Sequence, residues 1–177
     1  MEIALIIISV LLWLGALALL PGRGAVAPLL SFLGLFTLSF ARTDGYPLLP
    51  INGTILTTWL SMTLVVMVAS YLQPEPIRCQ TRGMAYIIGG AVTGMVVGLL
   101  GFTFTTVPSV LYAIMILATV IGIFLGFLLY TRTPDGAPVA IGSGNFFRYL
   151  LAKGFPTAIT VMQPGVALVL AISINSL

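Results

Sequence analysis

The last apolar stretch of the chain holds the polar side chains best suited to binding a small molecule or an ion. Thr157, Thr160 and Gln163 follow one another at three-residue spacing, and Pro164 comes directly after them. Because proline has no N–H, Pro164 cannot donate a hydrogen bond to the carbonyl of Thr160. Polar groups beside such a break are typical of the discontinuous helices that form substrate sites in transporters. The alternative is a kinked packing helix whose freed carbonyl is satisfied by a neighbouring helix.

Hydroxyl side chains mark one face of an earlier apolar stretch. Thr54, Thr57, Thr58 and Ser61 stand at positions i, i+3, i+4 and i+7, which fall on one side of an α-helix. Thr57, Thr58 and Ser61 are therefore candidates for the polar lining of a pathway. The same hydroxyls also suit hydrogen bonds to carbonyls of their own helix, or bonds between helices.

A cationic loop offers a candidate anion site. Ser143 and Asn145 belong to a glycine-containing run that opens a helix, and basic residues flank this run: Arg132, Arg148 and Lys153. Backbone N–H groups at a helix start, surrounded by cations, can hold a phosphate, a carboxylate or a lipid headgroup. Helix capping and loop charge explain the same residues without a ligand. For Lys153 we expect a side chain that extends to the membrane surface.

Small residues recur at four-residue spacing in two neighbouring apolar stretches. One stretch contains Gly90, Gly94 and Gly98, and the next contains Gly122 and Gly126. This spacing lets two helix backbones approach closely in a membrane, so we expect the two stretches to pack against each other. The alternative partner for either stripe is a second copy of the protein.

Residues for catalysis, metal binding or proton transfer are scarce. The chain has no histidine and a single cysteine, Cys79, and apart from Glu2 its acidic residues fall in predicted loops: Asp44, Glu75 and Asp135. Neither a nucleophile with its base, nor a carboxylate pair, nor a metal-ligand spacing can be assembled from them. We therefore expect no enzymatic activity, no metal, no cofactor, and no transport driven by a buried carboxylate.

The elements that position these side chains must be membrane-spanning helices. Hydrophobic residues make up 59% of the chain and charged residues 6%, with a mean hydropathy of +1.18, which indicates an all-α integral membrane protein. The apolar runs predict six transmembrane helices in one domain that covers residues 1–177: Ile3–Leu20, Ala25–Phe40, Thr54–Gln73, Met84–Phe104, Val110–Tyr130 and Gly154–Ile174. The second run covers only ~24 Å. A re-entrant hairpin formed by the first two runs is therefore the main alternative.

Basic residues predict how these helices are oriented. Six of the seven lie in or beside the first, third and fifth loops, whereas Arg42 stands alone in the second loop. Basic loops face the cytoplasm, so both termini are expected outside a bacterial inner (plasma) membrane crossed several times. The seven charges are scattered and form no stripe, which gives no indication of nucleic-acid binding.

A short motif occurs in both halves of the chain. Arg42-Thr43-Asp44-Gly45 follows the second predicted helix, and Arg132-Thr133-Pro134-Asp135-Gly136 follows the fifth. Repeats with three crossings each lie in opposite senses in a bilayer, so this pattern predicts a 3+3 inverted-topology repeat with halves near 1–83 and 84–177. The alternative is chance similarity between two short loops rich in common turn residues.

Together these features predict a transporter or channel-like module for a small solute or ion. The alternative function is a non-catalytic scaffold subunit of a larger membrane complex, in which the same polar groups only hold helices together. The expected partners are the lipid bilayer and either further copies of the chain or other membrane subunits. A water-filled cavity at Gln163 and Pro164 would favour transport, whereas a dry and fully packed centre would favour the scaffold.

Overall fold

Helices account for most of the structure, a computed structural model that describes residues 2–43, 46–105 and 107–175. Six of the helices described are long and apolar: α1 (Glu2–Arg23), α2 (Ala27–Leu38), α3 (Gly53–Tyr71), α5 (Met84–Leu99), α6 (Pro108–Thr131) and α8 (Phe155–Asn175). Short elements connect them: β1 (Arg42–Thr43), β2 (Tyr46–Pro47), α4 (Glu75–Arg78), the 3₁₀ helices η1 (Leu100–Thr103) and η2 (Pro134–Val139), α7 (Phe146–Tyr149) and the π-helical turn η3 (Leu150–Gly154).

Several helices are long and apolar enough to cross a membrane. Within the described residues these are Ile3–Arg23, Gly53–Tyr71, Pro108–Thr131 and Phe146–Ile174, while Ala27–Leu38 and Met84–Leu99 are shorter apolar helices. The chain is therefore an all-α membrane protein, apart from the small antiparallel pairing of β1 with β2.

Local sequence explains where several helices begin. Asn52 precedes α3 in an extended conformation, and its Oδ1 accepts a hydrogen bond from the backbone N–H of Ile55 at 2.9 Å. Prolines stand in the first turns of α2 and α6, where the missing N–H costs no intrahelical bond. Gly83, with a φ of +81°, precedes α5 and turns the chain into it.

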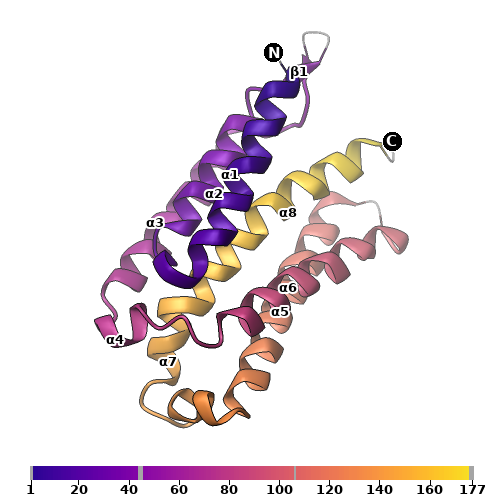
Figure 1. Ribbon diagram of the computed structural model, residues 1–177. Helices are drawn as coiled ribbons and strands as arrows, with labels where there is room; N and C mark the ends of the chain where they lie inside the picture. The colour runs from indigo at the N-terminus through magenta and orange to yellow at the C-terminus, as the bar shows by residue number, and fades with distance from the viewer. Residues whose placement is uncertain (1, 44–45, 106, 176–177) are drawn as a thin grey trace.

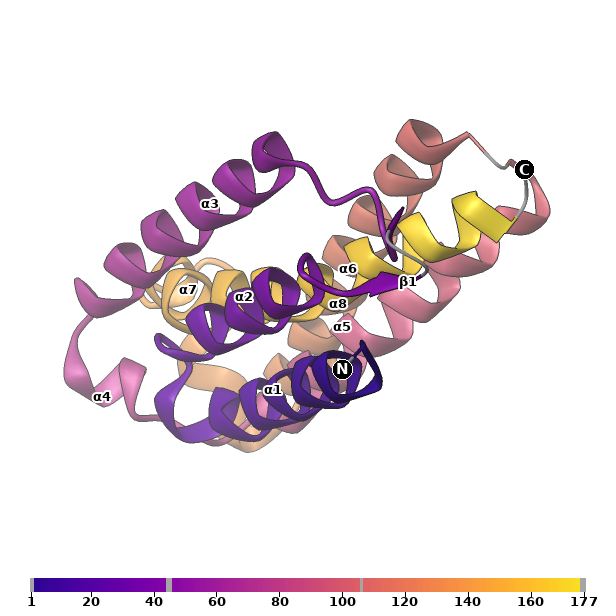
Figure 2. The ribbon, with the colours of Figure 1, turned by 90° about the horizontal axis from the view of Figure 1, so that it is seen from above.

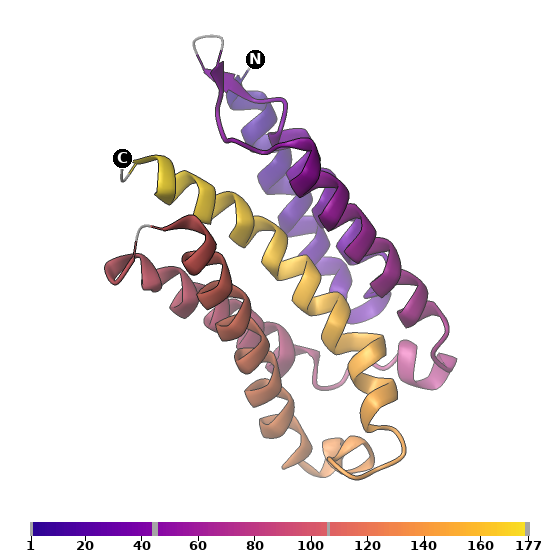
Figure 3. The same ribbon diagram turned by 180° about the vertical axis from the view of Figure 1, so that it is seen from behind.

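The long helices run alternately in opposite directions (Figure 1). Both ends of the chain and the β1–β2 hairpin lie at one end of the bundle, and α4, α7 and the loop after α6 lie at the other, as the reverse view also shows (Figure 3). Most of the basic residues belong to or flank the elements at this second end. We refer to it as the basic end.

Helix α8 occupies the centre of the bundle. Viewed along the bundle, α8 passes between α2 and α3 on one side and α5 and α6 on the other (Figure 2), and it also packs against α1. In an 18-residue apolar window of the candidate span that contains α8, 72% of the residues are buried, compared with 17% in the corresponding window of the α3 span. The polar residues of α8 therefore lie in protein rather than in lipid.

The glycine stripes of α5 and α6 face each other within the chain. A Cβ atom added at Gly90 would meet the carbonyl of Gly122, one at Gly94 would meet the carbonyl of Ala118, and one at Gly126 would meet that of Tyr86. A Cβ at Gly98 would lie 2.7 Å from the Cα of Met115, so hydrogen is the largest group that fits between these two backbones.

Several local features differ from the sequence-based prediction. The second helix ends at Leu38 instead of Phe40, and the last helical run begins at Phe146 instead of Gly154. The two copies of the repeated motif have different conformations, since Arg42–Thr43 forms strand β1, whereas Arg132 and Thr133 lie in a turn that precedes η2. Asp44 and Gly45 of the first copy lie outside the described residues.

Candidate functional site

Four polar residues of the last helical run are completely enclosed. Lys153, Thr157 and Gln163 have no exposed surface and Thr160 has 1%, although all four belong to an apolar stretch. Pro164 follows them inside α8. Buried polar groups in a membrane helix require partners from neighbouring helices, and these partners decide what the cluster can do.

The Thr160 carbonyl, which receives no hydrogen bond from Pro164, is bonded to a neighbouring helix. The hydroxyl of Ser31 on α2 donates to the Thr160 carbonyl at 2.9 Å, and the backbone carbonyl of Ser31 in turn accepts from the indole N–H of Trp13 at 3.1 Å. Ser31 has no exposed surface, so the hydrogen bond to the Thr160 carbonyl is formed inside the protein. The contact corresponds to the kinked packing helix that was the alternative to a substrate site.

Gln163 is held by α3. Its Nε2 donates to Oγ1 of Thr63 at 2.8 Å, and the Thr63 hydroxyl donates to the carbonyl of Trp59 at 2.7 Å. Two buried oxygens of the cluster, Oε1 of Gln163 and Oγ1 of Thr160, have no hydrogen-bond partner among the described residues. The cluster is therefore packed between helices, with two acceptors left over.

The hydroxyls singled out on α3 do not meet this cluster. Thr57, Thr58 and Ser61 are exposed on the outer face of α3. Thr57 donates to the carbonyls of residues 53 and 54 at 2.9 and 3.1 Å, and Ser61 donates to that of Thr57 at 2.8 Å. These two hydroxyls thus form bonds within their own helix.

The opposite face of α3 carries the residues that reach α8 and the preceding turn η3, and sequence reasoning missed them. Thr63 and Ser70 are both fully buried, and the Ser70 hydroxyl donates to the carbonyl of Ala152 in η3 at 3.1 Å. Their seven-residue separation places both on one face of α3. That spacing was a usable signal, but the denser run of hydroxyls on the other face obscured it.

Lys153 points into the protein, so the prediction that it extends to the membrane surface is wrong. Its Nζ donates to the carbonyl of Pro21, in the last turn of α1, at 3.1 Å. A cation at this position complements the negative end of the helix dipole and satisfies a carbonyl that has no partner within the helix. The hydroxyl of Thr157 donates to the backbone carbonyl of Lys153 at 2.8 Å.

The other residues predicted to hold an anion remain near the surface of the basic end. Arg132 and Arg148 are exposed, whereas Ser143 and Asn145 are half-buried. The hydroxyl of Ser143 is enclosed without a hydrogen-bond partner among the described residues. Since Lys153 is directed to α1, these five residues do not form one site.

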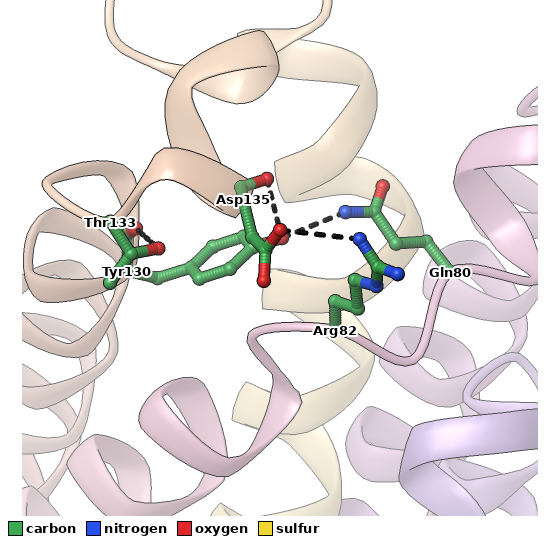
Figure 4. A network of polar contacts seen from close by, with 5 residues as sticks. All are labelled: Gln80, Arg82, Tyr130, Thr133 and Asp135. Atoms are coloured by element: carbon green, nitrogen blue, oxygen red, sulfur yellow. Dashed lines mark hydrogen bonds and ion pairs between the residues drawn. The ribbon is translucent and has the colours of Figure 1, made fainter.

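A polar network at the basic end joins the loop between α4 and α5 to the loop after α6 (Figure 4). Gln80 donates from Nε2 to the hydroxyl of Tyr130 at 2.9 Å, and that hydroxyl donates to the carbonyl of Asp135 at 3.1 Å. Arg82 lies 3.2 Å from the Asp135 carboxylate, and Thr133 bonds to the carbonyl of Tyr130. Arg82 and Asp135 are largely exposed, so their ion pair adds little stability beyond orienting the loops.

An apolar groove opens between α3, α6 and α8. Its volume is about 380 Å³, and its walls include Thr58, Trp59, Tyr112 and Ile159. The hydroxyl of Tyr112 is enclosed and has no hydrogen-bond partner among the described residues.

Comparisons of the chain with protein-family models, with curated proteins and with solved structures find no match.

Proposed function

We propose that the chain is a multi-pass protein of the plasma membrane, a bacterial inner membrane, with six crossings and both termini outside. The alternating direction of the six apolar helices supports this topology, with η1 lengthening α5 (Figure 1). The concentration of basic residues at one end supports a cytoplasmic location for that end. The occurrence of the two motif copies at opposite ends is compatible with an inverted repeat.

Within this membrane, we propose that the protein acts as a non-catalytic subunit that organises other membrane components. The enclosed centre of α8 is the observation that carries the proposal. Ser31 supplies the hydrogen bond that Pro164 withholds, and Thr63 holds Gln163, so the polar groups of α8 connect helices. Polar side chains used in this way stabilise a membrane bundle without forming a path through it.

The outer face of α3 is the surface we propose for a partner helix. It exposes Thr58 beside the groove that α3 forms with α6 and α8. Hydroxyl residues on a face directed away from the bundle promote contact between membrane helices. The Tyr112 side chain, on the other wall of the groove, adds aromatic surface for such a partner.

Transport of a small solute or ion is the second candidate function. It is favoured by the two enclosed oxygens without partners, Oε1 of Gln163 and Oγ1 of Thr160. Acceptors of this kind could coordinate a cation or a polar solute if α8 moved away from α2 and α3.

The test compares complex formation with transport. We expect the tagged protein, extracted in a mild detergent, to migrate in a complex of defined stoichiometry, and Thr58→Trp to dissociate that complex without lowering thermal stability. Leu117→Trp is the control, because Leu117 is 62% exposed on α6, outside the residues that line the groove. A monomeric parent protein, together with solute or ion flux in proteoliposomes that Gln163→Leu abolishes, would replace the scaffold with the transporter.

A further inference from the structure

A cavity lined in part by arginine at the basic end carries an inference that is independent of the proposed function. Its volume is about 280 Å³, and it lies between the α1–α2 turn and α4. The residues that line it belong to three segments: Gly22–Val26 of the turn, Tyr71 at the end of α3, and Arg78 with Cys79 at the end of α4. The cavity is separate from the loop that carries Arg132 and Arg148.

One wall of the cavity holds a guanidinium group in a defined position. The Cζ atom of Arg78 lies 5.3 Å from the centre of the Tyr71 ring, and its Nη1 donates to the Tyr71 carbonyl at 3.4 Å. Its Nη2 is 3.5 Å from the carboxylate of Glu75, whose side chain is 81% exposed. Because a guanidinium has five N–H groups, these contacts leave donors for a further acceptor.

A second and a third cation lie at the same cavity. Arg23, in the last turn of α1, is one of the lining residues and is exposed. Lys153 lies behind the turn, since a Cβ added at Gly24 would be 4.0 Å from its Cδ and its Nζ bonds to the Pro21 carbonyl. Lys153 thus carries a positive charge directly behind the wall of the cavity.

The charge of Lys153 lacks an acidic counterpart among the described residues. The ion pairs of that part of the chain join Arg78 to Glu75 and Arg82 to Asp135, and the ammonium of Lys153 is bonded to a neutral carbonyl. Three cations and the carboxylate of Glu75 give this region a net charge of +2. A buried charge is costly without an opposite charge, so an anion in the cavity would stabilise the region.

We propose that this cavity binds a phosphate group, with Arg23 and Arg78 as its direct ligands and Lys153 as the cation behind them. Arginine binds phosphate oxygens through paired N–H groups, and the start of α2, which adjoins the cavity at Val26, adds the positive end of a helix dipole. The phosphate belongs either to the headgroup of an anionic lipid or to a free phosphate ion.

Cys79 is an exposed residue of the cavity wall, so the reactivity of its thiol shows whether a ligand occupies the cavity. The labelling rate of Cys79 with an uncharged maleimide is measured on the whole protein in neutral detergent micelles. Inorganic phosphate is added in one series and phosphatidylglycerol in another. At a ligand concentration about ten times Kd, labelling of the parent should slow about tenfold, because mass action leaves only that fraction of cavities open.

Four variants make this measurement specific: the double substitution Arg23→Gln/Arg78→Gln, the single substitutions Arg23→Gln and Arg78→Gln, and Arg132→Gln as a control. The double variant should lose the protection, whereas Arg132→Gln, which removes an exposed charge at the same end, should keep it. Rates with and without ligand are compared within each variant, so a change in the intrinsic reactivity of Cys79 cancels.

Each outcome decides the proposal. Protection by phosphatidylglycerol alone identifies a lipid headgroup site, and protection by inorganic phosphate as well identifies a site open to free phosphate. Protection by neither compound overturns the proposal. Equal protection of the parent and the double variant also overturns it, because general attraction of anions to the basic end would then explain the result.

Discussion

At the scale of single residues, the contact between Ser31 and Thr160 holds the broken helix in place. Ser31→Ala should lower the free energy of unfolding by about 1–3 kcal/mol, because the Thr160 carbonyl would stay buried with neither a helix donor nor a side-chain donor. Thermal unfolding in detergent measures the change. Thr37→Ala is the control, since the Thr37 hydroxyl on the same helix is exposed and bonds only within it.

A second substitution tests that explanation directly. Pro164→Ala restores an N–H four residues after Thr160, so the carbonyl regains its donor within α8. Ser31→Ala should therefore cost much less in the Pro164→Ala background than in the parent. An equal cost in both backgrounds would mean that Ser31 stabilises the protein through packing and not through this carbonyl.

The hydrogen-bonded pair of Thr63 and Gln163 predicts a different pattern of stability in its single and double variants. Thr63→Val removes the acceptor of Gln163 Nε2 and leaves a buried amide without partners on either side, which should cost about 1–3 kcal/mol. The double variant Thr63→Val/Gln163→Leu replaces both partners by apolar groups and should recover to within about 1 kcal/mol of the parent. Thermal unfolding of the single and double variants measures this. A double variant as unstable as Thr63→Val would show that Gln163 has another essential contact.

At the scale of elements, the contact between α5 and α6 depends on glycine. Gly94→Ala places a methyl group against the carbonyl of Ala118, and overpacking of this kind costs about 1–3 kcal/mol. Gly89→Ala is the matched control in the same helix, because a Cβ there has no heavy atom within 4 Å. Thermal stability should fall for Gly94→Ala and stay constant or rise for Gly89→Ala. Equal stability of the two variants would exclude a close backbone contact at Gly94.

The π-helical turn η3 shows how one short element sets the role of a charged side chain. It joins α7 to α8 and contains Lys153, whose Nζ reaches the Pro21 carbonyl on α1, while the Ala152 carbonyl accepts from Ser70 on α3. A π-turn leaves the regular i to i+4 pattern of hydrogen bonds, so carbonyls in it are available to other helices. The turn thereby connects α8 to two neighbouring helices at the basic end.

At the scale of the whole molecule, the end that carries the basic residues should face the cytoplasm. A maleimide that cannot cross membranes should leave Cys79, which is exposed at this end, unlabelled in intact cells and label it after permeabilisation. In a Cys79→Ser background, Asn175→Cys should be labelled in intact cells. Labelling of Cys79 from outside would reverse the proposed orientation.

The sequence by itself determined the class of the protein and its local breaks. Apolar runs of sufficient length and very few charges require helices in a membrane, because only helices satisfy the backbone there without water. The missing N–H of Pro164 and the four-residue glycine spacing are likewise local properties. They identified the carbonyl that needs a donor and the two helices suited to close contact.

Only the tertiary structure decided which groups meet. Ser31 lies 129 residues before Thr160, and Thr63 lies 100 residues before Gln163, so no local pattern links them. The helices are apolar on nearly all sides, and the polar stripe that marks the outward face of a helix in a soluble protein is therefore missing. For this reason the outer hydroxyls of α3 and the inner pair of Thr63 and Ser70 were equally compatible with the sequence. The order and rotation of the packed helices selected the inner pair and turned Lys153 inward.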